Sequence, residues 1–288
     1  MGMSTERPAV LIVGHGSRHA EANAAFESLV AAYRRRHREW QIEFGYVELA
    51  EPSLLDALRH RCRSGASSIA LLPLFLFRAG HVKDDVPEAI AEVRSEFPDI
   101  EFRAADALGV HPSMREIMLE RATACGLEVP APEPGGCGCV PIDACKNTAI
   151  VVIGRGSSDP DANSDFCKLV RLFAEQSGLA WVLPCFTAIT GPSIEDALEL
   201  ISRLRPQRLI VLPYYLFNGV LLARIRDKVG RFAAAQPWLD VRIAEPIHFD
   251  DRLLSLMDER LEDALSGPGP LPCVNCKHRL LPLEEIGR

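Results

Sequence analysis

The chain lacks an excess of basic residues. Its 288 residues include 32 lysines and arginines against 39 aspartates and glutamates, which gives a formal net charge of −7. Because a polyanion is bound through a positive field, this balance argues against nucleic acid as a partner. The cluster of cations at 34–38 is better explained as the exposed end of an amphipathic helix, where positive charge also suits the helix dipole.

Long hydrophobic runs are also missing. No apolar stretch approaches the ~18 residues that a membrane span needs, and the opening MGMSTERPAV lacks the apolar centre of a signal peptide. We therefore expect a cytoplasmic protein with no membrane partner. Hydrophobic residues nevertheless make up 48% of the chain and charged residues 25%, so the chain can bury a core and is not disordered. Its length suits two medium-sized domains.

The chain repeats itself. Three separated segments of the first half match segments of the second half at one common offset, with glycines and apolar residues kept in place. Such agreement indicates an internal duplication. The matching pairs are AVLIVGHGSRHAEANAAFESLV (9–30) with AIVVIGRGSSDPDANSDFCKLV (149–170), EPSLLDAL (51–58) with GPSIEDAL (191–198), and LLPLFLF (71–77) with VLPYYLF (211–217).

Each copy alternates short runs rich in Val, Ile and Leu with amphipathic helical stretches. This alternation predicts parallel sheets with helices on both faces, and so an α/β protein made of two tandem doubly wound domains. The expected strands are 9–13, 42–48, 68–73 and 100–104 in the first copy, and 149–153, 180–186, 208–213 and 238–243 in the second. The expected helices of the first copy lie near 20–37, 52–64, 84–96 and 112–124.

Two segments interrupt the alternation. Residues 126–147, GLEVPAPEPGGCGCVPIDACKN, are rich in proline and glycine and lack periodicity, which is typical of a linker. Another Pro/Gly break opens the last segment, 267–288, which we interpret as a tail. We therefore expect an N-terminal domain over 8–125 and a C-terminal domain over 148–266.

Chemically active side chains follow three predicted strands of the first copy. VGHGSRH places His15 between two glycines after the first strand, Glu48 closes the second, and His81 follows the third. In open parallel sheets ligands bind beyond the carboxyl ends of the strands, so we expect these side chains to lie together at that edge of the sheet. Two imidazoles and a carboxylate suit a divalent first-row metal ion and can also accept protons.

The second copy has lost all three groups while keeping the glycines and the core residues. The three groups are therefore not needed for folding, which favours chemistry in the first half and a scaffolding role for the second. The replacements are Arg155 for His15, Ala188 for Glu48, and Val220 or Leu221 for His81, depending on where a one-residue gap is placed.

Simpler explanations exist for each residue alone. A histidine between glycines can be a turn residue, Glu48 a solvated strand end, and His81 a neighbour of a helix start. The motifs of three other enzyme classes are incomplete in this sequence. It lacks the arginine that precedes the histidine in histidine phosphatases, the Gly-x-Ser-x-Gly of serine hydrolases, and the lysine and the glycine spacing of phosphate-binding loops. A His-dependent phosphoryl-transfer enzyme remains the weaker alternative.

Together these motifs resemble a known family. The resemblance rests on four segments, VGHGSRHAEAN, VELAEPSLLDAL, LLPLFLFRAGHVKDDV and IGRGSSDPDAN. Over roughly residues 8–265 the chain resembles the long-form, CbiX-like sirohydrochlorin chelatases. These class II chelatases include cobaltochelatases of cobalamin biosynthesis and ferrochelatases of sirohaem biosynthesis. The resemblance implies two chelatase-like domains facing across a cleft, and a lyase that inserts Co²⁺ or Fe²⁺ into the tetrapyrrole sirohydrochlorin. We place cobalt ahead of iron, although the sequence does not separate the two metals.

The resemblance also implies roles for individual residues. The family's two metal-binding histidines fall on His15 and His81, and its strand-end carboxylate on Glu48. These three would be the catalytic groups, with the metal ion held by the two histidines and given up to the macrocycle. Asp84 or Asp85 would relay protons outward, unless they serve only helix-start electrostatics. The substrate would contact Ser17, Arg18, Gly80 and Lys83.

Cysteines gather in the linker and the tail. Nine cysteines are an odd number, and in a reducing compartment they favour thiols or metal ligands over disulfides. Some long chelatases carry an iron–sulfur cluster, and four thiolates here could hold [4Fe–4S] or Zn, although free thiols explain the pattern equally well. The candidate ligands are Cys137, Cys139, Cys145, Cys273 and Cys276.

One further class of function stays open. A non-catalytic carrier of tetrapyrrole or metal, with cysteines that sense redox state, would share the same motifs. Turnover separates the two, because a carrier binds its cargo stoichiometrically. Since one chain holds both copies, we expect a monomer to suffice, with a dimer left open.

Overall fold

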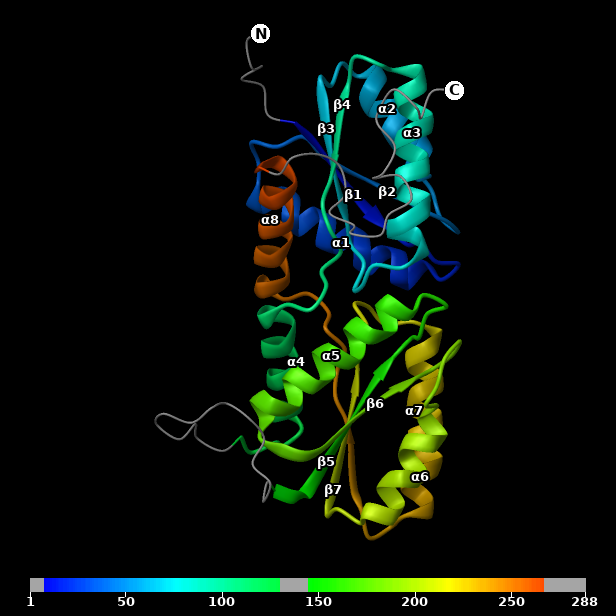
Figure 1. Cartoon of the computed structure of the whole chain (residues 1–288), viewed down its shortest axis with the longest axis vertical. Helices are drawn as coiled ribbons and strands as arrows, with labels where there is room; N and C mark the ends of the chain where they lie inside the picture. Colours follow the sequence, from blue (N-terminus) through cyan, green and yellow to red (C-terminus); the bar gives the residue numbers. More distant parts are fainter. Residues whose placement is uncertain (1–7, 130–144, 267–288) are drawn as a thin grey trace. The chain divides into compact units, whose positions relative to one another are not determined.

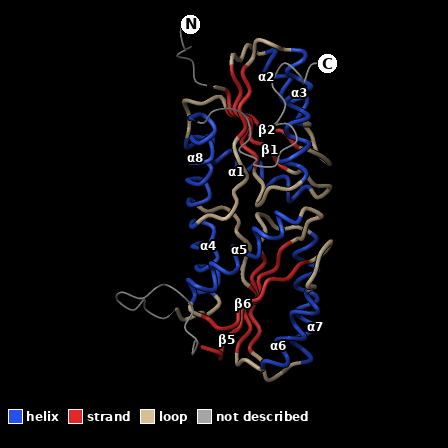
Figure 2. The backbone as a smooth tube through the Cα atoms, in the orientation of Figure 1, coloured by secondary structure: helices blue, strands red, loops and turns tan. Residues whose placement is uncertain are grey.

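The computed structural model describes residues 8–129 and 145–266, in which each repeat builds one four-stranded parallel sheet (Figure 1). Helices lie on both faces of each sheet (Figure 2). The α/β class and the tandem arrangement expected from the sequence are confirmed. Within the described residues, no helix has both the length and the hydropathy needed to cross a membrane.

The first sheet has the strand order β2-β1-β3-β4. Its central strand, β1, is buried along its whole length, as a run of Val, Leu and Ile requires when both faces are covered. The chain leaves β1 toward one neighbour, β2, and later returns on its other side as β3, so the strand order reverses at the carboxyl end of β1. The strands are β1 (Ala9–Gly14), β2 (Ile42–Tyr46), β3 (Ser68–Pro73) and β4 (Glu101–Ala104).

Alternate residues of β1 face different helices. Leu11 and Val13 pack in one core cluster with side chains from α2 and α3, including Leu58 and Val93. Helix α1 covers the other face, where its Phe26 ring lies against Gly14 so closely that a Cβ there would be 2.8 Å from the ring. The helices are α1 (Ala20–Arg36), α2 (Leu54–Arg63) and α3 (Val86–Glu96).

The second sheet repeats this topology in the order β6-β5-β7-β8. Its central strand packs with α6 and α7 through a cluster that includes Val151, Ile201 and Ile225. The elements are β5 (Cys145–Gly154), α5 (Pro160–Ser177), β6 (Leu179–Phe186), α6 (Ile194–Leu204), β7 (Arg208–Pro213), α7 (Val220–Ala235) and β8 (Asp240–Ile243).

The last helix of each repeat belongs to the compact unit of the other repeat. The first unit takes the chain up to Gly109 and again from Leu254, and the second unit takes Val110–Leu253. Helix α4 (Pro112–Ala124) therefore packs against α5 and β7, while most of α8 (Asp251–Ser266) lies in the first unit. The compact units differ in this respect from the sequence segments 8–125 and 148–266.

Polar contacts attach α8 within the first unit. The Asp258 carboxylate accepts a hydrogen bond from His37 Nε2 at 2.7 Å and pairs with Arg36 Nε at 3.0 Å. From the same helix, Arg260 donates to the carbonyl oxygens of Ala107 and Leu108 at 3.0 and 2.8 Å. Arg260 thus satisfies backbone carbonyls just beyond β4, where the strand ladder can no longer do so.

A single turn of π-helix, η1 (His81–Asp85), precedes α3 in the first repeat, whereas α7 begins directly at Val220. The chain has one residue more between buried Val82 and Val86 than between their counterparts Leu222 and Ile225. A π turn absorbs one extra residue without moving the buried positions on either side. The gap between the repeats therefore falls after His81, and its counterpart is Leu221.

Candidate metal and active site

His15, Glu48 and His81 meet at the carboxyl edge of the first sheet. They follow β1, β2 and β3 respectively, and one potential ligand atom from each lies within 4.8 Å of those of the other two. The strand-end reversal brings them together, since β1 has β2 on one side and β3 on the other. The sequence analysis predicted this grouping, and the structure places the three side chains together.

Backbone contacts hold the first two groups in register. Glu48 N donates to His15 O at 3.0 Å, which ties the loop after β1 to the loop after β2. Gly16 has φ +87°, and a Cβ at this position would lie 1.7 Å from Glu48 O. Only glycine therefore lets the two loops approach so closely.

The two imidazole rings stand edge to face. Their centroids are 4.5 Å apart with an interplanar angle of 79°, and the two Nε2 atoms are separated by 3.2 Å. Glu48 Oε1 lies 3.4 Å from His15 Nδ1. The side chains of His15 and His81 are 29% and 30% exposed, so the pair is partly open to solvent.

The Nδ1 atoms set which ring nitrogens are available to a ligand. His81 Nδ1 lies 2.6 Å from Asp85 Oδ2, and His15 Nδ1 lies 3.0 Å from Gly16 O. Both partners are acceptors, so each Nδ1 carries the hydrogen and each Nε2 presents a lone pair. Two lone pairs that face each other in this way can share a cation.

The spacing suits a first-row metal ion. An ion about 2.05 Å from both Nε2 atoms would subtend a nitrogen–metal–nitrogen angle of roughly 100°, close to tetrahedral. Neutral imidazoles bind such ions well yet reversibly, and a carboxylate beside them can accept protons. The site can therefore hold a divalent ion and release it to a competing ligand.

An aromatic side chain missed by the sequence analysis borders the pair. The ring centroid of Phe75 lies 6.4 Å from that of His15 and 5.8 Å from that of His81. Its position in the run LFLF marks it as a core residue, and nothing in the local sequence separates it from its neighbours. Comparison with the other repeat could have found it, because Tyr215 stands at the matching place.

The remaining predicted residues lie around the triad with different degrees of exposure. Arg18 is exposed, while Lys83 and Asp84 on η1 are half-buried. Ser17 Oγ accepts a hydrogen bond from His19 N at 3.1 Å, and Ser157 does the same for Asp159 N in the second repeat. This contact supports the loop in both copies, and a substrate role for Ser17, Arg18, Gly80 or Lys83 stays a prediction.

We expect Asp85→Asn to weaken metal binding at the His15–His81 pair by roughly 10-fold, because carboxylates that orient a ligating histidine contribute about that much. The loss follows from the Asp85 contact to His81 Nδ1. Titration with Co²⁺, followed by its visible absorption, measures the affinity. Asp84→Asn is the matched control, and an equal or larger loss in that variant would assign the orienting role to the wrong aspartate.

Most of the cysteines singled out above lie outside the described residues, namely Cys137, Cys139, Cys273 and Cys276. Cys145 begins β5, but its side chain is not among those described. The cluster therefore stays a prediction. Of the others, Cys185 is buried, and burial raises the pKa of its thiol to about 12, which is the behaviour of a core residue.

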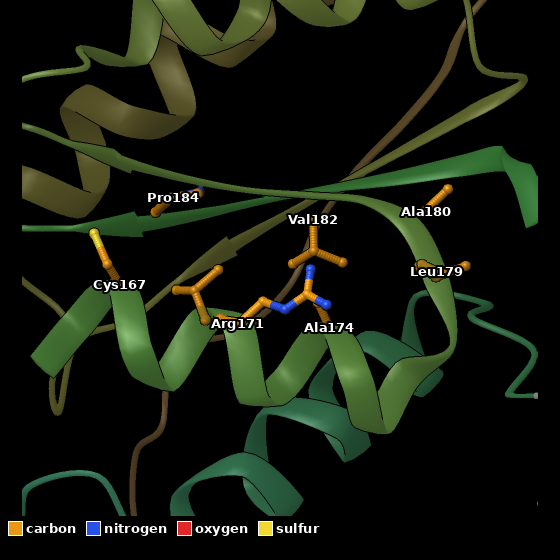
Figure 3. Close-up of a pocket in the computed structure, with 8 residues that line it drawn as sticks. Cys167, Arg171, Ala174, Leu179, Ala180, Val182 and Pro184 are labelled. Carbon is orange, nitrogen blue, oxygen red and sulfur yellow. The ribbon is translucent and has the colours of Figure 1, made fainter. Parts of the chain in front are cut away.

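A small pocket of about 190 Å³ lies in the second unit between α5 and β6 (Figure 3). It contains none of the predicted site residues, and burial raises the pKa of its one thiol, so that thiol is not activated. No imidazole or carboxylate like those of the triad lines the pocket. Its lining residues are Cys167, Val170, Arg171, Ala174, Leu179, Ala180, Val182 and Pro184.

Comparisons with known proteins agree with the duplicated architecture. The CbiX family matches the chain twice, over residues 9–125 and 149–264. A sirohydrochlorin cobaltochelatase of Priestia megaterium is 31% identical over 96% of this chain and 86% of that protein. A sirohydrochlorin ferrochelatase of the same organism is 28% identical over 91% of this chain and 92% of that protein. The solved structure of SirB from Bacillus subtilis with Fe³⁺ superposes with a TM-score of 0.75 at 25% identity, covering 91% and 96% of the two chains.

Proposed function

Because this chain belongs to the CbiX family, and its first repeat joins two histidines to a carboxylate, we propose that it inserts a divalent metal ion, Co²⁺ or Fe²⁺, into sirohydrochlorin. The observation that carries the proposal is the pair of Nε2 atoms 3.2 Å apart beside Glu48. The names of the chelatase relatives support the same reaction.

The metal ion is a substrate in this reaction and binds between His15 and His81. Two neutral imidazoles leave at least half of its coordination positions to water or to the macrocycle, so the ion can be handed over. The Asp85 carboxylate keeps the hydrogen of His81 on Nδ1, so that Nε2 stays directed at the ion.

Metal entry displaces two protons from the pyrrole nitrogens of the macrocycle. The overall exchange is one divalent cation for two protons, and a base near the ion must accept them. Glu48, half-exposed beside His15, is placed to take one, and each histidine becomes a base as soon as the ion leaves it. Asp85 then offers His81 a path for its proton toward solvent, since its own side chain is 46% exposed.

Cobalt is the metal that we place first. Imidazole and carboxylate accept both Co²⁺ and Fe²⁺, so the ligand set alone does not separate them. The cobaltochelatase relative is 31% identical and the ferrochelatase relative 28% identical, which supports cobalt by a small margin. Cobalt would send the product toward cobalamin and iron toward sirohaem.

The proposal is tested by anaerobic turnover. Purified protein is mixed with sirohydrochlorin and either Co²⁺ or Fe²⁺, and the visible spectrum of the macrocycle is followed beside a protein-free control. We expect many turnovers per chain and a higher kcat/KM with Co²⁺. Stoichiometric binding without acceleration would contradict the proposal and favour a carrier, in which the cysteines of the linker and tail would serve redox sensing or hold [4Fe–4S] or Zn.

A further inference from the structure

The second repeat has not merely lost the groups of the triad, because four of its replacements share a chemical direction. Two positions gain a hydroxyl group, a third exchanges an imidazole for a permanently charged guanidinium, and the fourth loses a carboxylate. The fifth change, from His81 to the apolar Leu221, only removes a metal ligand, whereas the other four favour an anion over a metal cation. The four replacements are Arg155 for His15, Thr187 for Val47, Ala188 for Glu48 and Tyr215 for Phe75.

The backbone that presents these groups is the same as in the first repeat. Thr187 N donates to Gly154 O at 2.9 Å and Ala188 N to Arg155 O at 3.1 Å. Gly156, with φ +85°, again permits the close approach, because a Cβ there would lie 2.1 Å from Ala188 O. Arg155 therefore leaves β5 where His15 leaves β1, at the strand end at which a doubly wound sheet binds ligands.

Two of the new side chains are hydrogen-bonded to each other, and one of them also contacts the backbone of Arg155. Thr187 Oγ1 lies 2.9 Å from Tyr215 Oη and 3.2 Å from Arg155 O. Burial raises the pKa of Tyr215 to about 12, while the positive charge of Arg155 acts in the opposite direction. The phenol therefore stays protonated at neutral pH, and the positive charge of Arg155 acts on it electrostatically. Arg155 itself is exposed.

We propose that Arg155, with the hydroxyl groups of Tyr215 and Thr187, forms a carboxylate-binding site that anchors the tetrapyrrole substrate through one of its acidic side chains. The inference rests on the proposed function, because a sirohydrochlorin chelatase acts on a polyanionic macrocycle. A planar guanidinium matches a carboxylate with two parallel hydrogen bonds.

The hydroxyl pair adds a donor that Phe75 and Val47 cannot supply. Without ligand, Thr187 can donate to the carbonyl of Arg155 and accept from Tyr215. When a carboxylate arrives, Thr187 can donate to Tyr215 instead, which frees the phenol hydrogen for the carboxylate. The absence of a carboxylate at Ala188 removes the repulsion that Glu48 would cause at the equivalent place.

Binding of the metal-free macrocycle to the full chain tests the proposal. We expect Arg155→Gln to raise the Kd for sirohydrochlorin by roughly 10-fold, Tyr215→Phe by a smaller factor, and Arg155→Lys to restore part of the loss. Arg171→Gln, which removes an exposed arginine of the same unit, is the matched control and should bind like wild type. Co²⁺ affinity at the triad should be equal in all variants.

A macrocycle whose carboxylates have been converted to amides tests whether the guanidinium recognises the charge of the carboxylates. Wild type and Arg155→Gln should bind this compound equally, because the partner of the guanidinium is gone. If wild type binds and metallates sirohydrochlorin but Arg155→Gln matches Arg171→Gln, the carboxylate site is wrong and the proposed function stands. If wild type does not bind the macrocycle at all, both proposals fail.

Discussion

Replacing either His15 or His81 by alanine is expected to reduce metal insertion by at least about 100-fold, the lower range for loss of a positioned base. Each substitution leaves one imidazole facing empty space, where two Nε2 atoms now lie 3.2 Å apart. Because both side chains are about 30% exposed, their loss should change the free energy of unfolding by less than about 1 kcal/mol. Anaerobic rates and denaturant unfolding measure the two effects separately.

His60→Ala is the matched control for these variants. His60 lies on α2 with a side chain that is 68% exposed, so its removal costs one imidazole without touching the triad. Its rate should equal that of wild type. A His15→Ala variant that inserts metal at the rate of His60→Ala would remove His15 from the mechanism, and with it the main argument for a site in the first repeat.

The substitution Gly16→Ala should both destabilise the fold and disable the site. At φ +87°, alanine bears the cost of a left-handed conformation, and its Cβ would lie 1.7 Å from Glu48 O. The loop after β2 must move away, which separates Glu48 from His15. We expect the free energy of unfolding to fall by about 3 kcal/mol and Co²⁺ binding at the triad to weaken. Urea unfolding and Co²⁺ titration follow these two quantities.

Substitutions at two other glycines separate the backbone strain from the steric clash as causes of the lost stability. Gly65 also has φ +87°, but a Cβ there would meet nothing within 4 Å, so Gly65→Ala should cost only the backbone strain, about 1 kcal/mol. Gly156→Ala repeats the clash in the second repeat and should destabilise like Gly16→Ala while leaving Co²⁺ affinity unchanged. Equal stability of the Gly16→Ala and Gly65→Ala variants would contradict the steric argument.

The strands could be predicted closely because their signal is local. A strand buried on both faces must be a continuous apolar run, and AVLIV before Gly14 is such a run; β1 covers Ala9–Gly14, where 9–13 was expected. β5 shows the limit, since it begins at Cys145, four residues before the expected start at 149, in a stretch without apolar continuity. Pairing with β6 determines that extension, and pairing is not local.

The triad could be predicted because topology turns sequence order into proximity. Parallel strands all end at one edge, so any three strand-end residues of neighbouring strands are candidates, and the repeat showed which of them are dispensable for folding. Phe75 and the choice of Asp85 over Asp84 as the partner of His81 escaped prediction. Both depend on the direction of a side chain. For His81 and Asp85 the π turn helps to set that direction, and the periodicity of the sequence does not reveal a π turn.

The exchange of last helices has a consequence for how the chain can be divided. A cut within 126–147 would separate α4 from α5 and β7, and α8 from the first sheet, so neither product would retain a complete core. The arrangement is that of a domain swap written into a single polypeptide. Two separate half-chains would have to find each other at a rate set by their concentration, whereas here the partner is always tethered. Each unit therefore completes itself at any dilution.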